Sequence, residues 1–93
     1  MGKINIDQIK LEREIEVIDA SDATNIMVSF ASGKMPIDRE DIDQMVTAIR
    51  DGVKFPPVVL NRDNVLVDGH HRYMAYKRLG MKEIPFTYDR DAQ

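Results

Sequence analysis

Residues 65–72 read Val-Leu-Val-Asp-Gly-His-His-Arg, and this stretch decides how the rest of the chain is interpreted. The first three residues form an apolar run typical of a strand, and the pattern from Asp68 to Leu79 predicts a helix that ends at Gly80. A strand therefore runs into a helix almost without a loop. Asp68 can cap that helix, and Gly69 allows a ligand to approach the backbone closely.

This junction is a predicted anion site, because the first N–H groups of a helix have no partner within it and the helix dipole adds positive charge there. Arg72 shares a helix face with Ala75, Tyr76 and Leu79, which suit packing on a sheet. Helical side chains tilt toward the N-terminus, so Arg72 would reach back to the junction. Two interpretations stay open: Arg72 binds a phosphate, or it is a structural clamp paired with Asp68 or another acid.

The two histidines of the motif are ambiguous in the same way. His71 is either a phosphate donor or a structural histidine, and we expect His70 to be exposed. Adjacent helical residues point about 100° apart and no third ligand is evident, so the sequence predicts no metal site. The chain has no cysteine, which excludes disulfides, thiolate metal sites and a cysteine nucleophile.

A second helix is predicted upstream. Asp38 is a good N-cap, and Gly52 is placed to end the helix. The apolar side chains that follow one helical face are Ile42, Met45, Val46 and Ile49.

Several strands are predicted around these helices. A β-hairpin spans residues 58–67, and the final strand covers 84–88, where Pro85 suggests an edge or a strand start. Residues 14–18 alternate polar and apolar side chains, as in a strand, and residues 26–30 are interpreted as a second strand. Residues 3–10 are a short strand or lead-in. This order of elements indicates an α+β fold with a small mixed β-sheet and packed helices.

The length and charge of the chain limit the number of domains and the kind of partner that we expect. The 93 residues suffice for one domain, residues 1–93, with a motif-bearing core at 37–88. The net charge is −3, yet residues 69–82 contain four basic residues, two histidines and no acid. An anionic partner should therefore meet that segment. No apolar run approaches the ~20 residues of a membrane span, and the N-terminus lacks a signal-peptide pattern, so we expect a cytoplasmic protein.

Residues 42–88 resemble the N-terminal domain of the ParB/sulfiredoxin superfamily. The resemblance rests on ordered features: a helix that ends at 50–52, Pro-Pro-Val-Val-Leu at 56–60, the strand–helix run at 65–73, and Ile-Pro-Phe at 84–86. Together they cover about half of the chain and imply a ParB/sulfiredoxin-like fold.

The resemblance also implies a nucleotide. In this superfamily a Gly-x-x-Arg motif binds nucleotide phosphates: ParB-type members bind and hydrolyse CTP, sulfiredoxin uses ATP, and a free-serine kinase uses ADP. Carried over by position, the phosphate cradle would comprise Gly69, His70, His71 and Arg72. Pro56 and Pro57 match a loop that flanks the nucleotide, and Mg²⁺ would be held mainly by the phosphates.

Sequence differences from the family exclude some of the functions that its members have. Sulfiredoxin needs a cysteine where this chain has His71, so sulfinic acid repair is excluded. Partition-type ParB proteins carry further DNA-binding elements after the last strand, so we do not expect site-specific centromere binding. Nothing in the sequence supplies the two-metal carboxylate cluster of a nuclease.

Three functions follow, in order. The first is a nucleotide-binding domain with slow hydrolysis or phosphoryl transfer. The second is a non-enzymatic module that binds a nucleic-acid backbone or another protein, as a phage or mobile-element regulator would. The third is a kinase-like or nuclease-like enzyme in which Asp68 or His71 acts as the catalytic acid or base.

Overall fold

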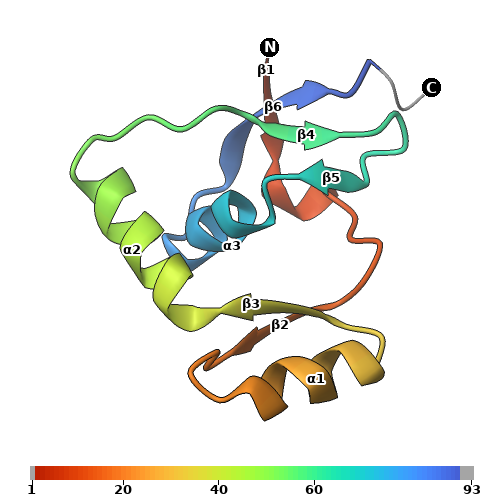
Figure 1. The fold of residues 1–93 in the computed structure, drawn as a ribbon. Helices are drawn as coiled ribbons and strands as arrows, with labels where there is room; N and C mark the ends of the chain where they lie inside the picture. Colours follow the sequence, from red (N-terminus) through yellow and green to blue (C-terminus); the bar gives the residue numbers. More distant parts are fainter. Residues whose placement is uncertain (1, 91–93) are drawn as a thin grey trace.

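Residues 2–90 form two sheets, and the larger has four strands in the order β1–β6–β4–β5 (Figure 1). Their bounds are β1 (Gly2–Asn5), β4 (Val58–Leu60), β5 (Leu66–Asp68) and β6 (Glu83–Tyr88). β6 is antiparallel to β1 and parallel to β4, and β4 is antiparallel to β5, so the sheet is mixed as predicted and the hairpin is confirmed. This computed structural model describes residues 2–90.

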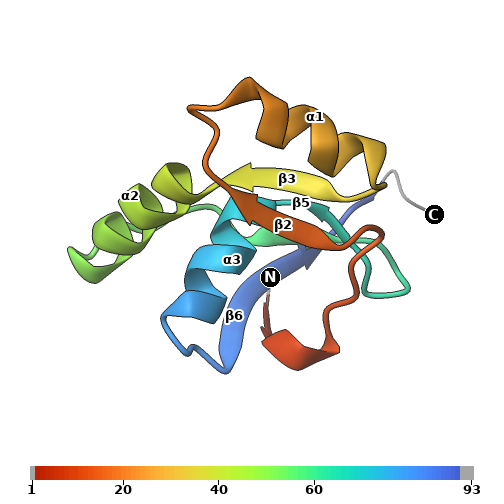
Figure 2. The same cartoon turned by 90° about the horizontal axis from the view of Figure 1, so that it is seen from below.

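A two-stranded parallel sheet lies on the other side of the molecule. It pairs β2 (Ile15–Ile18) with β3 (Met35–Asp38), and α1 (Ala23–Ala31) connects the two strands. Figure 2 shows α1 covering the outer face of this pair, while α3 (His70–Arg78) lies on its inner side, between the two sheets. A single-turn 3-10 helix, η1 (Ile6–Gln8), follows β1.

The prediction of a strand at residues 26–30 is wrong, because these residues lie within α1. The Asp22 carboxylate accepts a hydrogen bond from the Thr24 N–H at 2.9 Å, so a cap starts the helix before the apolar run begins. Gly33 then takes a φ of +77° just after the helix ends. β3, which was not predicted, follows at once.

The other two helices match their predictions. α2 (Arg39–Arg50) begins at Asp38, whose carboxylate accepts the Glu40 N–H at 3.2 Å. The predicted face of α2 is the buried one: Ile42 and Val46 are buried, and Met45 and Ile49 are half-buried.

Pro85 is the third residue of β6, an interior strand, so of its two predicted positions the edge strand is wrong, and Pro85 lies close to the strand start instead. The reason is local: β4 pairs with β6 only from Phe86 onward, and Pro85 pairs with Lys3 of β1 alone. A missing N–H is therefore tolerated at that position.

Two apolar clusters fix α3 from both sides. Tyr73 and Tyr76 pack with the four-stranded sheet, and Ala75 packs with Ile37 of β3 and with α2. Because α3 is held on two faces, its N-terminal turn has a defined position between the sheets. No helix within residues 2–90 is long and apolar enough to cross a membrane.

Candidate functional site

α3 begins without a side-chain cap, unlike α1 and α2. Its N-cap residue is Gly69, in the left-handed conformation with a φ of +97°, and no side chain accepts a hydrogen bond there. The prediction that Asp68 caps the helix is therefore wrong. Asp68 is the last residue of β5, and its carboxylate is 74% exposed. The first N–H groups of α3 are left open to a ligand.

Arg72 reaches back to the junction, as its register predicted, and its side chain is only 13% exposed. Its Nη1 donates to the carbonyl oxygen of Pro56 at 2.8 Å and to that of Pro57 at 3.3 Å. Its Nη2 lies 3.4 Å from Oδ2 of Asp68. The guanidinium thus joins three parts of the chain, mainly through backbone carbonyls and with one exposed carboxylate.

Gly69 lies directly under this guanidinium. A Cβ at Gly69 would be 2.9 Å from Nη2, 3.0 Å from Nε and 3.1 Å from Cζ of Arg72. Any side chain at position 69 would therefore displace Arg72. Glycine is required here both for its φ and for this close approach.

His70 is half-buried, so the prediction that it is exposed is wrong. Burial lowers the pKa of His70, and the nearby Asp68 carboxylate opposes that shift. His70 lines the same pocket as residues 35–37 of β3, a strand that the sequence did not predict. His71 is exposed, with Nε2 3.9 Å from Oδ2 of Asp41 on α2.

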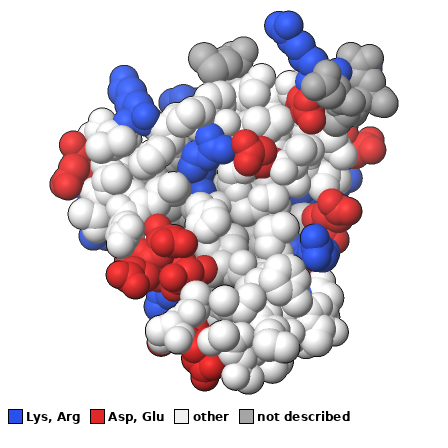
Figure 3. Space-filling view, in the orientation of Figure 1, with Lys and Arg blue, Asp and Glu red and all other residues white. Residues whose placement is uncertain are grey.

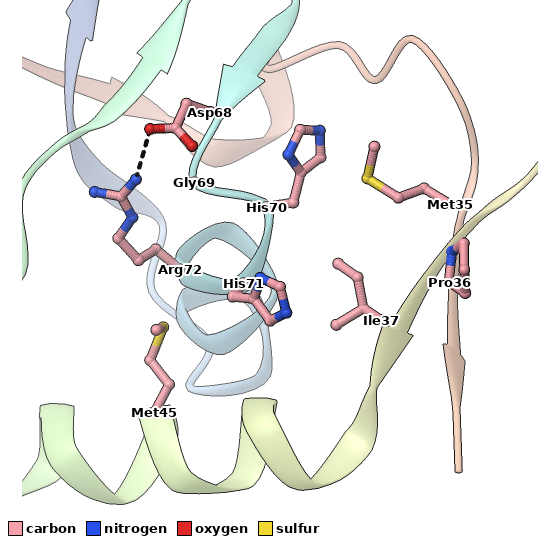
Figure 4. A pocket seen from close by; sticks show the side chains of 9 residues that line it. All are labelled: Met35, Pro36, Ile37, Met45, Asp68, Gly69, His70, His71 and Arg72. Atoms are coloured by element: carbon pink, nitrogen blue, oxygen red, sulfur yellow. Dashed lines mark hydrogen bonds and ion pairs between the residues drawn. The ribbon is translucent and has the colours of Figure 1, made fainter. Parts of the chain in front are cut away.

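The open N-terminus of α3 faces a pocket of about 330 Å³ (Figure 4). Residues 68–72 form one wall, residues 35–37 of β3 form another, and Met45 of α2 contributes to the lining. In Figure 4 the guanidinium of Arg72 and the imidazole of His70 lie on opposite sides of Gly69. The whole Asp-Gly-His-His-Arg motif therefore lines one cavity.

A second pocket, of about 360 Å³, shares His71 and Met45 with the first. Its other lining residues are Asp41, Gln44, Ala48 and Phe55. Sequence reasoning identified neither this pocket nor the β3 wall. Pro56 and Pro57 line neither cavity, and instead contact the site through Arg72.

Acidic side chains gather next to the site. On the face drawn in Figure 3, a group of acidic residues lies over the N-terminal part of α2, where Glu40 and Asp41 occupy the first turn. Basic residues of α3 are partly engaged: Arg78 pairs with Asp43, and Lys77 lies 5.6 Å from the centre of the Tyr73 ring. The segment is therefore less positive toward solvent than its sequence suggests.

Among residues 2–90, no group of three or more His, Cys, Asp or Glu side chains is placed to hold a metal ion. A cation at this site would need most of its ligands from a bound molecule.

Comparison with solved structures supports the fold. The chain matches a conserved hypothetical protein from Pyrococcus furiosus (18% identity, TM-score 0.61), covering 95% of this chain and 31% of that one. It matches a free serine kinase in complex with AMP (18%, 0.61), covering 96% and 30%, and a Pnob8-like ParB-N domain (21%, 0.59), covering 94% and 28%. The chain thus spans less than a third of each of these proteins.

At the level of sequence, no curated protein matches the chain. A family model described as the ParB N-terminal domain matches residues 6–90, from the 3-10 helix to beyond β6. That match covers most of the chain and includes every element around the α3 junction. The chain therefore belongs to the ParB N-terminal domain family.

Proposed function

We propose that this chain binds a nucleotide of the CTP, ATP or ADP type, with its phosphates at the N-terminus of α3. The observation that carries the proposal is the uncapped start of α3 at Gly69, which faces a pocket, whereas carboxylates cap α1 and α2. The free N–H groups and the helix dipole favour an anion there. The phosphates would lie in the pocket that Gly69, His70, His71 and Arg72 line.

The fold is compatible with such a ligand. The free serine kinase that shares it was solved with AMP and, as a mutant, with ADP. In this chain, Mg²⁺ would take its oxygen ligands mainly from the phosphates and water, because the described residues offer no carboxylate cluster. The ion would neutralise phosphate charge.

Any slow hydrolysis or phosphoryl transfer would depend chiefly on His71. Its imidazole is exposed, lines both pockets and lies near the Asp41 carboxylate, so it can reach a bound phosphate chain. Asp68, the other predicted acid or base, is committed to Arg72 in an ion pair. We therefore assign the proton-transfer role to His71 ahead of Asp68.

A nucleic-acid backbone is a weaker alternative. The acidic first turn of α2 and the ion pair between Arg78 and Asp43 reduce the positive surface that a polyanion needs. Binding to a nucleic acid would show little base selectivity and a steep dependence on salt concentration.

The test is a thermal-shift screen with CTP, ATP, ADP, GTP and inorganic phosphate, each with and without Mg²⁺. A ligand at about 100 times its Kd should stabilise the domain by roughly 2.7 kcal/mol, which raises Tm by about 10 °C or more for a domain of this size. Gly69→Ala should abolish the shift, while Gly52→Ala, at a remote glycine of similar φ, should retain it. An equal shift in both variants would place the ligand elsewhere.

A further inference from the structure

We infer that Arg72 is a positioning residue: it holds Phe55 in place, so that the second pocket can receive the base of the nucleotide. This inference rests on the proposed function. It assigns the pocket at Phe55 to a flat aromatic base, and it gives Arg72 a role that differs from direct phosphate binding.

Few hydrogen bonds hold residues 54–57. In the described structure, the hydrogen bonds of this segment are the two that Pro56 and Pro57 accept from Arg72. Val53 still bonds to Ala48 at the end of α2, and pairing within the sheet resumes at Val58. Arg72 is therefore the polar anchor of the segment between α2 and β4.

Two consecutive prolines make that segment stiff. Proline fixes its own φ and restricts the residue before it, so the backbone of Phe55 and Pro56 has little freedom. Fixing the Pro56 carbonyl therefore fixes the direction of the adjacent Phe55. Phe55 is half-buried and forms one wall of the second pocket.

The two pockets are continuous with each other. They share His71 and Met45, so a ligand with its phosphates at α3 can extend past His71 toward Phe55. An aromatic ring offers a stacking surface for any base, and the amide of Gln44 in the same pocket can both donate and accept hydrogen bonds. Inorganic polyphosphate lacks a base and would not use this wall.

The donors of Arg72 point toward the protein. Its Nη1 is directed at two carbonyl oxygens, and its Nη2 lies near Asp68. The guanidinium lies against Gly69, on the side away from His70 (Figure 4). Both Nη atoms thus have protein acceptors, and the N–H groups of the first turn of α3 remain for the phosphates.

The experiment compares two ligands, inorganic tripolyphosphate and a nucleoside triphosphate (ATP and CTP in turn), by calorimetry. Arg72→Met keeps the aliphatic stem and removes the hydrogen bonds. It should weaken the better-bound nucleotide about tenfold, within the range for a lost base–aromatic stack. The affinity for tripolyphosphate should fall by less than about threefold, from loss of a screened charge. Arg62→Met, in the exposed hairpin turn, is the matched control and should change neither affinity.

A double-mutant cycle tests the route through Phe55. Phe55→Ala alone should weaken the nucleotide and spare tripolyphosphate. The double variant should lose no more than the larger single loss, because both changes remove the same wall. Independent effects that multiply would overturn the inference, as would an equal loss of both ligands in Arg72→Met.

Two further results complete the test. If Arg72→Met does not fold, Arg72→Lys takes its place: it keeps the charge on a single donor nitrogen and loses the planar fork. It should spare tripolyphosphate and weaken the nucleotide by less than about tenfold. Should wild-type protein bind neither ligand, the proposed function itself fails, and the inference fails with it. If the wild-type protein binds both ligands and the Arg72 variants lose affinity equally for both, the inference is overturned but the proposed function stands.

Discussion

Arg72 donates from Nη1 to the carbonyl oxygen of Pro56 at 2.8 Å, which joins the first turn of α3 to a residue sixteen positions earlier in the chain. The same side chain is only 13% exposed and has a carboxylate partner in Asp68. The link connects α3 to the segment between α2 and β4, and no secondary-structure pairing makes that connection. It therefore affects stability as well as any ligand.

Arg72→Ala should destabilise the ligand-free protein by about 1–3 kcal/mol, because it removes charge-assisted hydrogen bonds made by a side chain that is only 13% exposed. Denaturant melts measure this change. Arg62→Ala, a substitution of an exposed arginine in the hairpin turn, should cost less than about 0.5 kcal/mol. Equal small losses in both variants would contradict the structural role of Arg72.

Gly69→Ala should cost more than Gly52→Ala. Both glycines have similar positive φ values, +97° and +90°, so the conformational cost of about 1–2 kcal/mol is shared. A Cβ at Gly52 meets nothing within 4 Å, whereas one at Gly69 meets the Arg72 guanidinium. In an Arg72→Ala background the difference between the two glycine variants should disappear. A difference that persists there would have another cause.

The pH dependence of stability should carry a contribution from His70. Burial lowers the pKa of His70 from its ordinary value of 6.5, so below that pH the unfolded state binds more protons than the folded state. This contribution is fully present above about pH 6.5 and is lost as the pH falls toward the lowered pKa of the folded protein. Denaturant melts from about pH 7.5 to about pH 5.5 should therefore show a shallower decline in His70→Gln than in wild type. Parallel curves would rule out this contribution.

Ser29→Ala should leave stability unchanged or raise it by up to about 1 kcal/mol. The hydroxyl of Ser29 is fully buried and has no hydrogen-bond partner, so removing it relieves an unmet polar group. Ser32→Ala is the control, because the Ser32 hydroxyl donates to the Val28 carbonyl at 2.9 Å. A loss in Ser29→Ala above about 1 kcal/mol would mean that its hydroxyl has a partner, such as a buried water.

The sequence predicted α2, α3 and the hairpin because the apolar pattern of each element agrees with its burial, and in α2 the Asp38 cap agrees as well. In α1 they do not agree: Met27 and Phe30 are 71% and 58% exposed, while Ser29 is buried. An apolar run that faces solvent looks like a strand when pattern alone is considered. The Asp22 cap and Gly33 were the available signals for a helix. β3 was missed because it contains Pro36, and proline argues against a strand. β3 also pairs with only one strand.

The features of the site that belong to a single helix could be predicted from the sequence. The Gly69–Arg72 run and the direction of Arg72 follow from helix geometry. The partners of Arg72 do not, because Pro56 and Pro57 come from a segment whose approach is set by tertiary packing. The second pocket depends on Gln44 and Phe55, which only the packing of α2 brings beside His71.

The placement of β6 has a consequence for synthesis on the ribosome. β6 is the last strand of the domain to be made, yet it lies between β1 and β4 and pairs with both. Until residues 83–88 have left the exit tunnel, β1 has no neighbour in the sheet and β4 has only β5. A nascent chain arrested before β6 emerges would therefore expose two unpaired strand edges to chaperones and proteases.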